Sequence, residues 1–196
     1  MSFLLGLTGS IGMGKSTTAA MFRDLGHPVW DADAAVHRLY APGGAAVAPV
    51  TALFPMARAA DGGVDRAALR LALARDPDAM ARLEQVVHPL VAADRAAFIE
   101  ARRDRPLVVL DIPLLFESGI EAELDGVAVV STDPETQTAR VLARPGMTDQ
   151  ALQMILARQI PDAEKRARAD WIIPTDTSDG ARVAVAALCQ EILSRA

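Results

Sequence analysis

The chain has 196 residues, a formal net charge of −5, 51% hydrophobic residues and 23% charged residues. This length allows one well-buried core with room for an inserted subdomain, and the composition is that of a folded enzyme rather than a disordered segment. The acidic balance argues against a surface that coats nucleic acid, because no extended basic face is available to displace counterions. The single cysteine, Cys189, argues against an internal disulfide or a cysteine-based metal site.

The N-terminal segment has no basic leader, and its apolar run is too short for a signal peptide or a membrane span. The sequence therefore predicts a cytoplasmic protein without membrane contact. Phe3–Thr8 is typical of a strand that is covered on both faces. A glycine-rich turn follows, and residues 15–25 predict a helix that ends at Gly26. Residues 28–30 predict a second short strand.

From residue 45 to 104 the pattern changes. Asp65 and Asp76 are candidate helix N-caps, and apolar residues at helical spacing predict three consecutive helices. Strands resume with the apolar runs at 107–112, 127–130 and 171–173. Helices are predicted at 134–144, from Thr148 or Asp149 to Gln159, and in a final stretch capped by Asp179. This alternation predicts an α/β fold, a doubly wound parallel sheet of about five strands with a helical insertion.

The strongest motif follows the first strand. Residues 9–16, Gly-Ser-Ile-Gly-Met-Gly-Lys-Ser, match G-x-x-x-x-G-K-[ST] at every specified position. Glycines let the backbone wrap closely around an anion, and the following helix adds its positive N-terminal end. Lys15 can reach the β- and γ-phosphates, and the Ser16 hydroxyl can supply one oxygen to Mg²⁺. A glycine-containing tight turn is the alternative, but the flanking strand and helix favour a P-loop NTPase-type nucleotide site.

Several protein classes share this loop. GTPase switches select guanine with an Asn-Lys-x-Asp element, and this chain contains no asparagine and no Asp-x-x-Gly sequence. A motor or transporter ATPase normally has a longer chain. The sequence therefore favours an ATP-dependent kinase of a small metabolite. A nucleotide-binding regulatory module is the alternative outside the enzymes, and phosphate transfer to an added acceptor distinguishes the two.

Two pairs of charged residues are candidates for the chemistry. Asp31 and Asp33 follow the second strand, where a carboxylate could accept a proton from the acceptor hydroxyl. One of them could instead cap the helix that begins near residue 34, and strand alternation predicts that the two face opposite ways. Arg140 and Arg144 are spaced to lie on one helix face, where they could neutralise the transferring phosphate. Two solvated surface arginines are the alternative.

Over nearly its whole length the chain resembles the dephospho-coenzyme A kinase family. The phosphate loop alone is generic, whereas the phrases His-Pro-Leu and Ile-Pro-Leu-Leu-Phe-Glu in this order and spacing are specific. The matching segments are Leu7–Thr17, Asp31–Asp33, Asp65-Arg66, His88–Leu90, Asp111–Glu117, Gln137 with Arg140 and Arg144, Gln159, and Ala169-Asp170.

The resemblance implies an enzyme that transfers the γ-phosphate of ATP to the ribose 3′-hydroxyl of dephospho-coenzyme A, the last step of coenzyme A synthesis. It implies three parts: a nucleotide-binding core (residues 1–44, 105–135 and 169–196), a helical domain for the acceptor (45–104) and a small helical lid (136–168). The expected partners are these two small molecules and Mg²⁺, with no nucleic acid. We expect a monomer or a weak homo-oligomer.

The family pattern also assigns residues. Asp33 is the expected base, Arg140 the lid arginine, and Asp31 a capping residue or a water-mediated contact to Mg²⁺. The expected ATP-binding set is Gly12, Met13, Gly14, Lys15, Ser16, Thr17 and Arg144, with Lys15 also catalytic. The expected acceptor-binding set is His88, Pro113, Leu114, Leu115 and Glu117. For His88, a packed or capping histidine beside a helix-starting proline is an equal alternative. Residues 113–117 could likewise form only a strand-to-helix connection.

The chain departs from the family pattern after the last predicted strand. Similar proteins tend to carry an asparagine and a glycine near the adenine, whereas this chain has Pro174-Thr175-Asp176-Thr177. The departure leaves fold and reaction unchanged but predicts altered contacts to the base.

Overall fold

The computed structural model describes residues 2–195 and divides the chain into two compact units. A sheet unit comprises the chain up to Trp30 and from Arg102 onward, and a helical unit comprises Asp31 to Ala101. The helical unit thus begins earlier than the expected boundary at residue 45. Within the described residues, no helix combines the length and apolar character needed to cross a bilayer.

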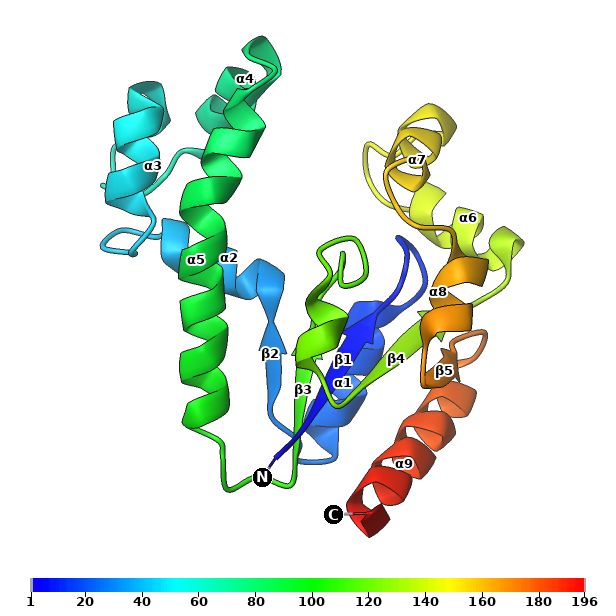
Figure 1. Cartoon of the computed structure of the whole chain (residues 1–196). Helices are drawn as coiled ribbons and strands as arrows, with labels where there is room; N and C mark the ends of the chain where they lie inside the picture. The colour runs from blue at the N-terminus through cyan, green and yellow to red at the C-terminus, as the bar shows by residue number, and fades with distance from the viewer. Residues whose placement is uncertain (1, 196) are drawn as a thin grey trace. The chain divides into compact units, whose positions relative to one another are not determined.

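The sheet contains five strands in the order β2-β3-β1-β4-β5. They are β1 (Phe3–Thr8), β2 (Val29–Asp31), β3 (Leu107–Asp111), β4 (Gly126–Ser131) and β5 (Trp171–Pro174). Strand β1 pairs in parallel with β3 on one side and β4 on the other, and β4 pairs in parallel with β5 (Figure 1). The predicted five-stranded α/β sheet is confirmed. In such sheets ligands bind beyond the carboxyl end of the strand where the order reverses, which here is β1.

One face of the sheet is covered by α1 (Lys15–Asp24) and α9 (Ser178–Arg195). Alternate strand residues such as Leu5, Leu7 and Val109 join Phe22 and Val185 in this core. Cys189 is buried in the same core, and burial raises the pKa of its thiol to about 11. Cys189 therefore serves as a small buried hydrophobic residue of this core.

The segment between β3 and β4 packs against the opposite side of β1, since a Cβ at Gly6 would lie 2.6 Å from Leu115 Cδ1 and 2.5 Å from Leu124 Cδ1. This segment contains the short helix η2 (Ile120–Glu123). Between β4 and β5 lie α6 (Pro134–Leu142), α7 (Asp149–Leu156) and α8 (Asp162–Arg168). Asp133 and Thr148 cap the first two through their side chains. Helix α8 was not predicted.

The helical unit contains α2 (Ala32–Tyr40), α3 (Val47–Leu53), η1 (Pro55–Ala57), α4 (Arg66–Arg75) and α5 (Ala79–Glu100). Its own apolar core includes Val50, Phe54, Leu69, Leu83 and Val87. The Asp65 side chain caps α4 as predicted, by accepting from two backbone N–H groups.

Two expected helices of this unit are a single one, because α5 is continuous (Figure 1) and Pro89 lies within it. The φ angle of proline suits a helix, and its cost is one missing N–H and a local clash. Packing of Leu83 and Val87 in the core on the preceding turns favours continuing the helix across that defect. The predicted start of a separate helix at Pro89 was therefore wrong, and α3 was not predicted, although residues 45–104 do contain three α-helices.

Candidate functional site

The phosphate loop connects the carboxyl end of β1 to α1, as the motif predicted. Gly12 and Gly14 adopt positive φ angles of 80° and 87°, a region in which residues with a side chain are strained. Helix α1 begins at Lys15 immediately after the loop. Its free N–H groups and dipole therefore favour an anion at this end. The loop brings the predicted residues Gly12 to Thr17 together.

A buried ion pair fixes Lys15. Its Nζ lies 2.5 Å from Oδ1 of Asp111, whose side chain is only 2% exposed. Asp111 ends β3 and lies opposite Leu7 of β1 in the strand register. Parallel pairing of the two strands therefore places this carboxylate beside the loop. The sequence reasoning gave Asp111 no role, although four apolar strand residues followed by aspartate are a usable signal for an acid at this edge.

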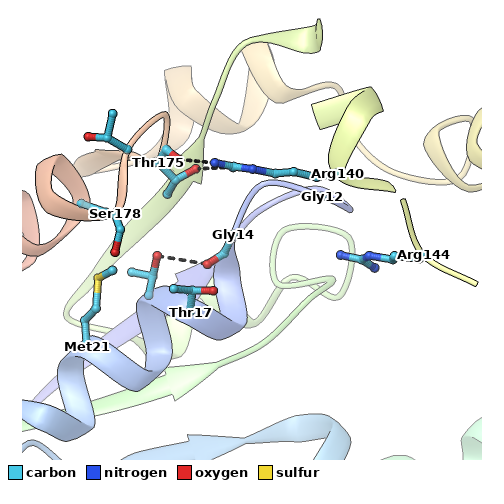
Figure 2. Close-up of a pocket in the computed structure, with 11 residues that line it drawn as sticks. Gly12, Gly14, Thr17, Met21, Arg140, Arg144, Thr175 and Ser178 are labelled. Carbon is cyan, nitrogen blue, oxygen red and sulfur yellow. Dashed lines mark hydrogen bonds between the residues drawn. The ribbon is translucent and has the colours of Figure 1, made fainter. Parts of the chain in front are cut away.

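A cavity of about 260 Å³ lies against the loop. Figure 2 shows Gly12, Gly14, Thr17 and the two predicted arginines around it. Its remaining lining residues come from α1, from the segment after β5 and from the start of α9: Thr18, Met21, Thr175, Thr177, Ser178 and Ala181. Arg140 lies in α6, whereas Arg144 lies just beyond its end. The prediction of one shared helix face was therefore wrong, but both arginines reach the cavity.

Thr175 links the arginine to the loop. Its hydroxyl donates to the Met13 carbonyl at 2.8 Å. Its own carbonyl accepts from Arg140 Nη2 at 2.6 Å (Figure 2). The neighbouring polar side chains also have protein partners. Asp176 accepts from Thr132, and the Thr177 hydroxyl accepts from the Gly180 N–H at the start of α9. The cap of this helix is thus Thr177 rather than the predicted Asp179.

Asp31 and Asp33 have different environments within the helical unit. Asp31 ends β2 and caps α2, with Oδ1 accepting from the Ala34 N–H at 2.9 Å. Asp33 lies in the first turn of that helix, is exposed, and makes no hydrogen bond or ion pair with the described side chains. One of the two is a cap, as expected. Strand alternation is not the reason, because Asp33 is helical.

His88 is exposed on α5, inside the continuous helix. It therefore neither packs in the core nor caps a helix that begins at Pro89. Its placement leaves the imidazole open to a ligand.

Residues 113–117 follow β3 without forming a helix. The Pro113 carbonyl accepts from the Thr8 hydroxyl at 3.1 Å. Leu115 is fully buried, whereas Leu114 is 46% exposed. Of the predicted acceptor-binding residues in this segment, Leu114 is the most exposed, whereas Leu115 packs in the core.

Glu117 is engaged by a second buried ion pair. Its Oε1 lies 2.9 Å from Nζ of the fully buried Lys165 and accepts from the Ile160 N–H at 2.9 Å. Burial alone would raise the pKa of Glu117, but the Lys165 ammonium and the Ile160 N–H outweigh it and hold that pKa below its usual value. Glu117 Oε2 is buried and has no hydrogen-bond partner among the described residues. Lys165, on the unpredicted α8, gave no signal in sequence because a lysine on a short helix is usually solvated.

The residues available to Mg²⁺ fit that ion. Among the described residues, no group of three or more His, Cys, Asp or Glu side chains is placed to hold a metal. Mg²⁺ instead commonly takes one or two protein oxygens and completes its shell with phosphate oxygens and water. The Ser16 hydroxyl in the first turn of α1 and the Asp111 carboxylate offer such oxygens.

Comparisons with known proteins agree with this arrangement. The family model for dephospho-CoA kinase matches residues 3–180. The dephospho-CoA kinase of Jannaschia sp. (strain CCS1) is 60% identical over 192 residues, which cover 98% of each chain. A crystal structure from Thermus thermophilus superposes with a TM-score of 0.83 at 38% identity, covering 97% of each chain. Dephospho-CoA kinase from Campylobacter jejuni, at 24% identity and the same coverage, shares the fold with a TM-score of 0.69.

Proposed function

Because this chain belongs to the dephospho-CoA kinase family, whose members are ATP-dependent kinases, we propose that it transfers the γ-phosphate of ATP to the ribose 3′-hydroxyl of dephospho-CoA. The products are CoA and ADP, and the reaction is the final step of coenzyme A biosynthesis. One observation of the structure carries the proposal: a cavity lined by the glycines of the phosphate loop, the start of α1 and two arginines.

The loop and its cations bind the phosphates. The oriented N–H groups of the loop and the N-terminus of α1 receive the phosphate oxygens, and Lys15 neutralises charge on the β- and γ-oxygens. Arg140 and Arg144 stabilise the charge on the transferring group. Thr175 supports this role for Arg140, because its carbonyl fixes the guanidinium at the edge of the cavity.

Magnesium completes the phosphate site in our proposal. The Ser16 hydroxyl and the Asp111 carboxylate would supply the protein oxygens that bind the ion. Asp31 would contact it only through a water molecule. When bound, the ion neutralises charge on the phosphate oxygens. Asp111 also keeps the Lys15 ammonium at the loop through the buried pair.

Asp33 acts as the base. Its carboxylate is exposed and has no partner among the described side chains, so it is available to accept a hydrogen bond from the 3′-hydroxyl. Phosphoryl transfer needs little covalent assistance, so the carboxylate mainly orients the hydroxyl oxygen and takes its proton late. The bond that forms joins the 3′-oxygen to the γ-phosphorus, and the bond that breaks joins that phosphorus to the β,γ-bridging oxygen of ATP.

The acceptor contacts we propose are His88, Pro113 and Leu114. Glu117 assists indirectly, because Oε1 of its carboxylate is occupied by Lys165 and Ile160. Leu115 supports the same segment from the core.

The test is phosphate transfer by the purified protein with ATP and Mg²⁺. Dephospho-CoA should be converted to CoA, detected by chromatography, while nucleoside monophosphates and shikimate react at no more than background. Conversion of another acceptor with dephospho-CoA inert would overturn the proposal.

A further inference from the structure

Two glutamine side chains hold the same residue of the phosphate loop. Gln137 Nε2, on α6, donates to the Ile11 carbonyl at 2.7 Å. Gln159 Oε1, in the turn after α7, accepts from the Ile11 N–H at 3.1 Å. The identity of each amide atom follows from chemistry, since a carbonyl only accepts and a backbone N–H only donates. Gln137 is therefore required as a donor and Gln159 as an acceptor.

The contact is part of a closely packed interface. Gln137 is only 7% exposed. A Cβ at Gly12 would lie 2.6 Å from Val141 Cγ2 and 2.9 Å from the Gln137 carbonyl oxygen, so the glycine lets α6 approach the loop. Helix α6 therefore fixes the loop backbone directly.

The two hydrogen bonds set the direction of loop amides. In a trans peptide the C=O and the following N–H point opposite ways. Holding the Ile11 carbonyl toward Gln137 consequently turns the Gly12 N–H away from α6. The Thr175 hydroxyl acts in the same way on the Met13 carbonyl and hence on the Gly14 N–H. The Ile11 N–H is already taken by Gln159, which removes it from the donors available to an anion.

We infer that Gln137 and Gln159 are positioning residues for phosphate binding. They orient the amides of the phosphate loop, and they tie to it both ends of the segment between them, which carries Arg140 and Arg144. The inference rests on the proposed ATP site. Neither glutamine is among the residues that line the cavity, and both act through the Ile11 peptide groups.

Reciprocal substitutions test the assigned donor and acceptor. Gln137→Glu cannot donate and Gln137→Met offers no polar atom, so both should weaken ADP binding about five- to twentyfold, the scale of one or two lost hydrogen bonds. Gln159→Met should weaken it to a similar extent. Gln159→Glu keeps an acceptor for the Ile11 N–H and should lose clearly less than Gln137→Glu. Gln153→Glu, an exposed glutamine on α7, is the matched charge control.

The readouts are calorimetric ADP affinity, adenosine affinity by competition, and thermal unfolding. A positioning role on the phosphate amides predicts that adenosine affinity stays within about twofold in every variant while ADP affinity falls. Equal losses of ADP and adenosine affinity, or a greater loss in Gln159→Glu than in Gln137→Glu, would overturn the inference. Absence of ADP binding by the unmodified protein would instead contradict the proposed function.

Discussion

The sheet unit and the helical unit use polar side chains differently. In the sheet unit, buried polar groups hold the backbone or each other: Lys15 with Asp111, Lys165 with Glu117, and Gln137 with the loop. The ion pairs Arg38–Asp94 and Arg82–Asp76 of the helical unit lie at its surface, as does the pair Arg182–Asp24 of the sheet unit. Arg38–Asp94 and Arg82–Asp76 leave 54% and 46% of their arginine side chains accessible.

This difference suits the two units to different roles, phosphate binding in the sheet unit and acceptor binding in the helical unit. In the sheet unit, protein partners hold two cations of the proposed phosphate site, Lys15 and Arg140, which is the condition for electrostatic stabilisation without reorganisation. The helical unit leaves Asp33 and His88 exposed and therefore available to an acceptor. Substitutions in the sheet unit should affect both stability and phosphate chemistry. Substitutions at the exposed positions of the helical unit should affect catalysis with little change in folding.

Lys15 provides the largest expected effect. Lys15→Ala should lower turnover by about a thousandfold, because the ammonium stabilises charge more in the transition state than in the ground state. It should also destabilise the fold, since it leaves the buried Asp111 carboxylate without its cation. Single-turnover phosphate transfer and urea unfolding measure the two effects.

The double variant Lys15→Ala/Asp111→Asn separates them. It should regain stability relative to Lys15→Ala without regaining turnover, since the buried charge is removed but the catalytic cation is still missing. Near-normal turnover in Lys15→Ala would show that the loop is not the reaction centre.

Substitution of Asp33 tests the expectation that an exposed residue of the helical unit affects catalysis without affecting stability. Asp33→Asn should lose about a hundredfold in turnover, the usual scale for a positioned base, while ATP affinity and unfolding stay near normal. The matched control is Asp31→Asn, which should lose less turnover, because asparagine also caps a helix and Asp31 serves as the cap of α2. Single-turnover rates with separately measured ATP affinities distinguish binding from chemistry. A larger loss at Asp31 would move the base to that residue.

Glu117 provides a smaller effect with a pH dependence. Glu117→Gln should destabilise the protein by about 2 kcal/mol at pH 7, because it leaves the ammonium of Lys165 buried without a counter-charge. The pKa of Glu117 is lowered in the folded state, so its stabilisation is present above about pH 4.5 and declines as the pH falls through the folded-state value. The stability gap between wild type and Glu117→Gln should therefore narrow in urea titrations below pH 4.5. A gap that widens with acidification would contradict the assigned pair.

The fold was largely predictable because its signals are local. Apolar runs marked all five strands, and the glycine-lysine spacing located the loop between strand and helix. The prediction that a helix begins at Pro89 failed, because tertiary packing on the turns before this residue outweighs the local cost of a proline inside a helix. Helix α8 was missed because it has few apolar residues, and its anchor Lys165 is buried only by contacts distant in sequence.

The part of the candidate site that could be predicted is the phosphate loop, because one short sequence motif contains all of its residues. The loop residues come together because they are consecutive in the chain. Asp111, Thr175, Gln137 and Gln159 act on the loop from positions that are distant in sequence. No spacing rule connects them to Ile11, Met13 or Lys15, so only the folded chain reveals which backbone group each side chain holds.

The smallest expected effect concerns the nucleotide base. Similar proteins tend to carry an asparagine and a glycine in the stretch that is Pro174-Thr175-Asp176-Thr177 here, and the three polar side chains of 175–177 all have protein partners. A site discriminates strongly between bases when it contains a hydrogen-bonding side chain that the wrong base leaves unpaired. Thr175 and Asp176 are engaged with Met13 and Thr132, and the Thr177 hydroxyl accepts from Gly180. We therefore expect recognition of the base edge to rely on backbone groups or on a different side chain.

We therefore expect GTP to serve as a phosphate donor with a kcat/KM within about tenfold of that for ATP, because one mispaired hydrogen bond costs about that factor. Initial rates with each nucleotide at saturating dephospho-CoA measure the ratio. The matched variant is Asp176→Asn, which keeps an acceptor for the Thr132 hydroxyl and introduces an amide donor near the cavity wall formed by Thr175 and Thr177. It should change the ATP-to-GTP ratio while leaving the rate with ATP within about twofold. Rejection of GTP by more than a hundredfold in the unmodified protein would mean that fixed groups outside 174–177 read the base.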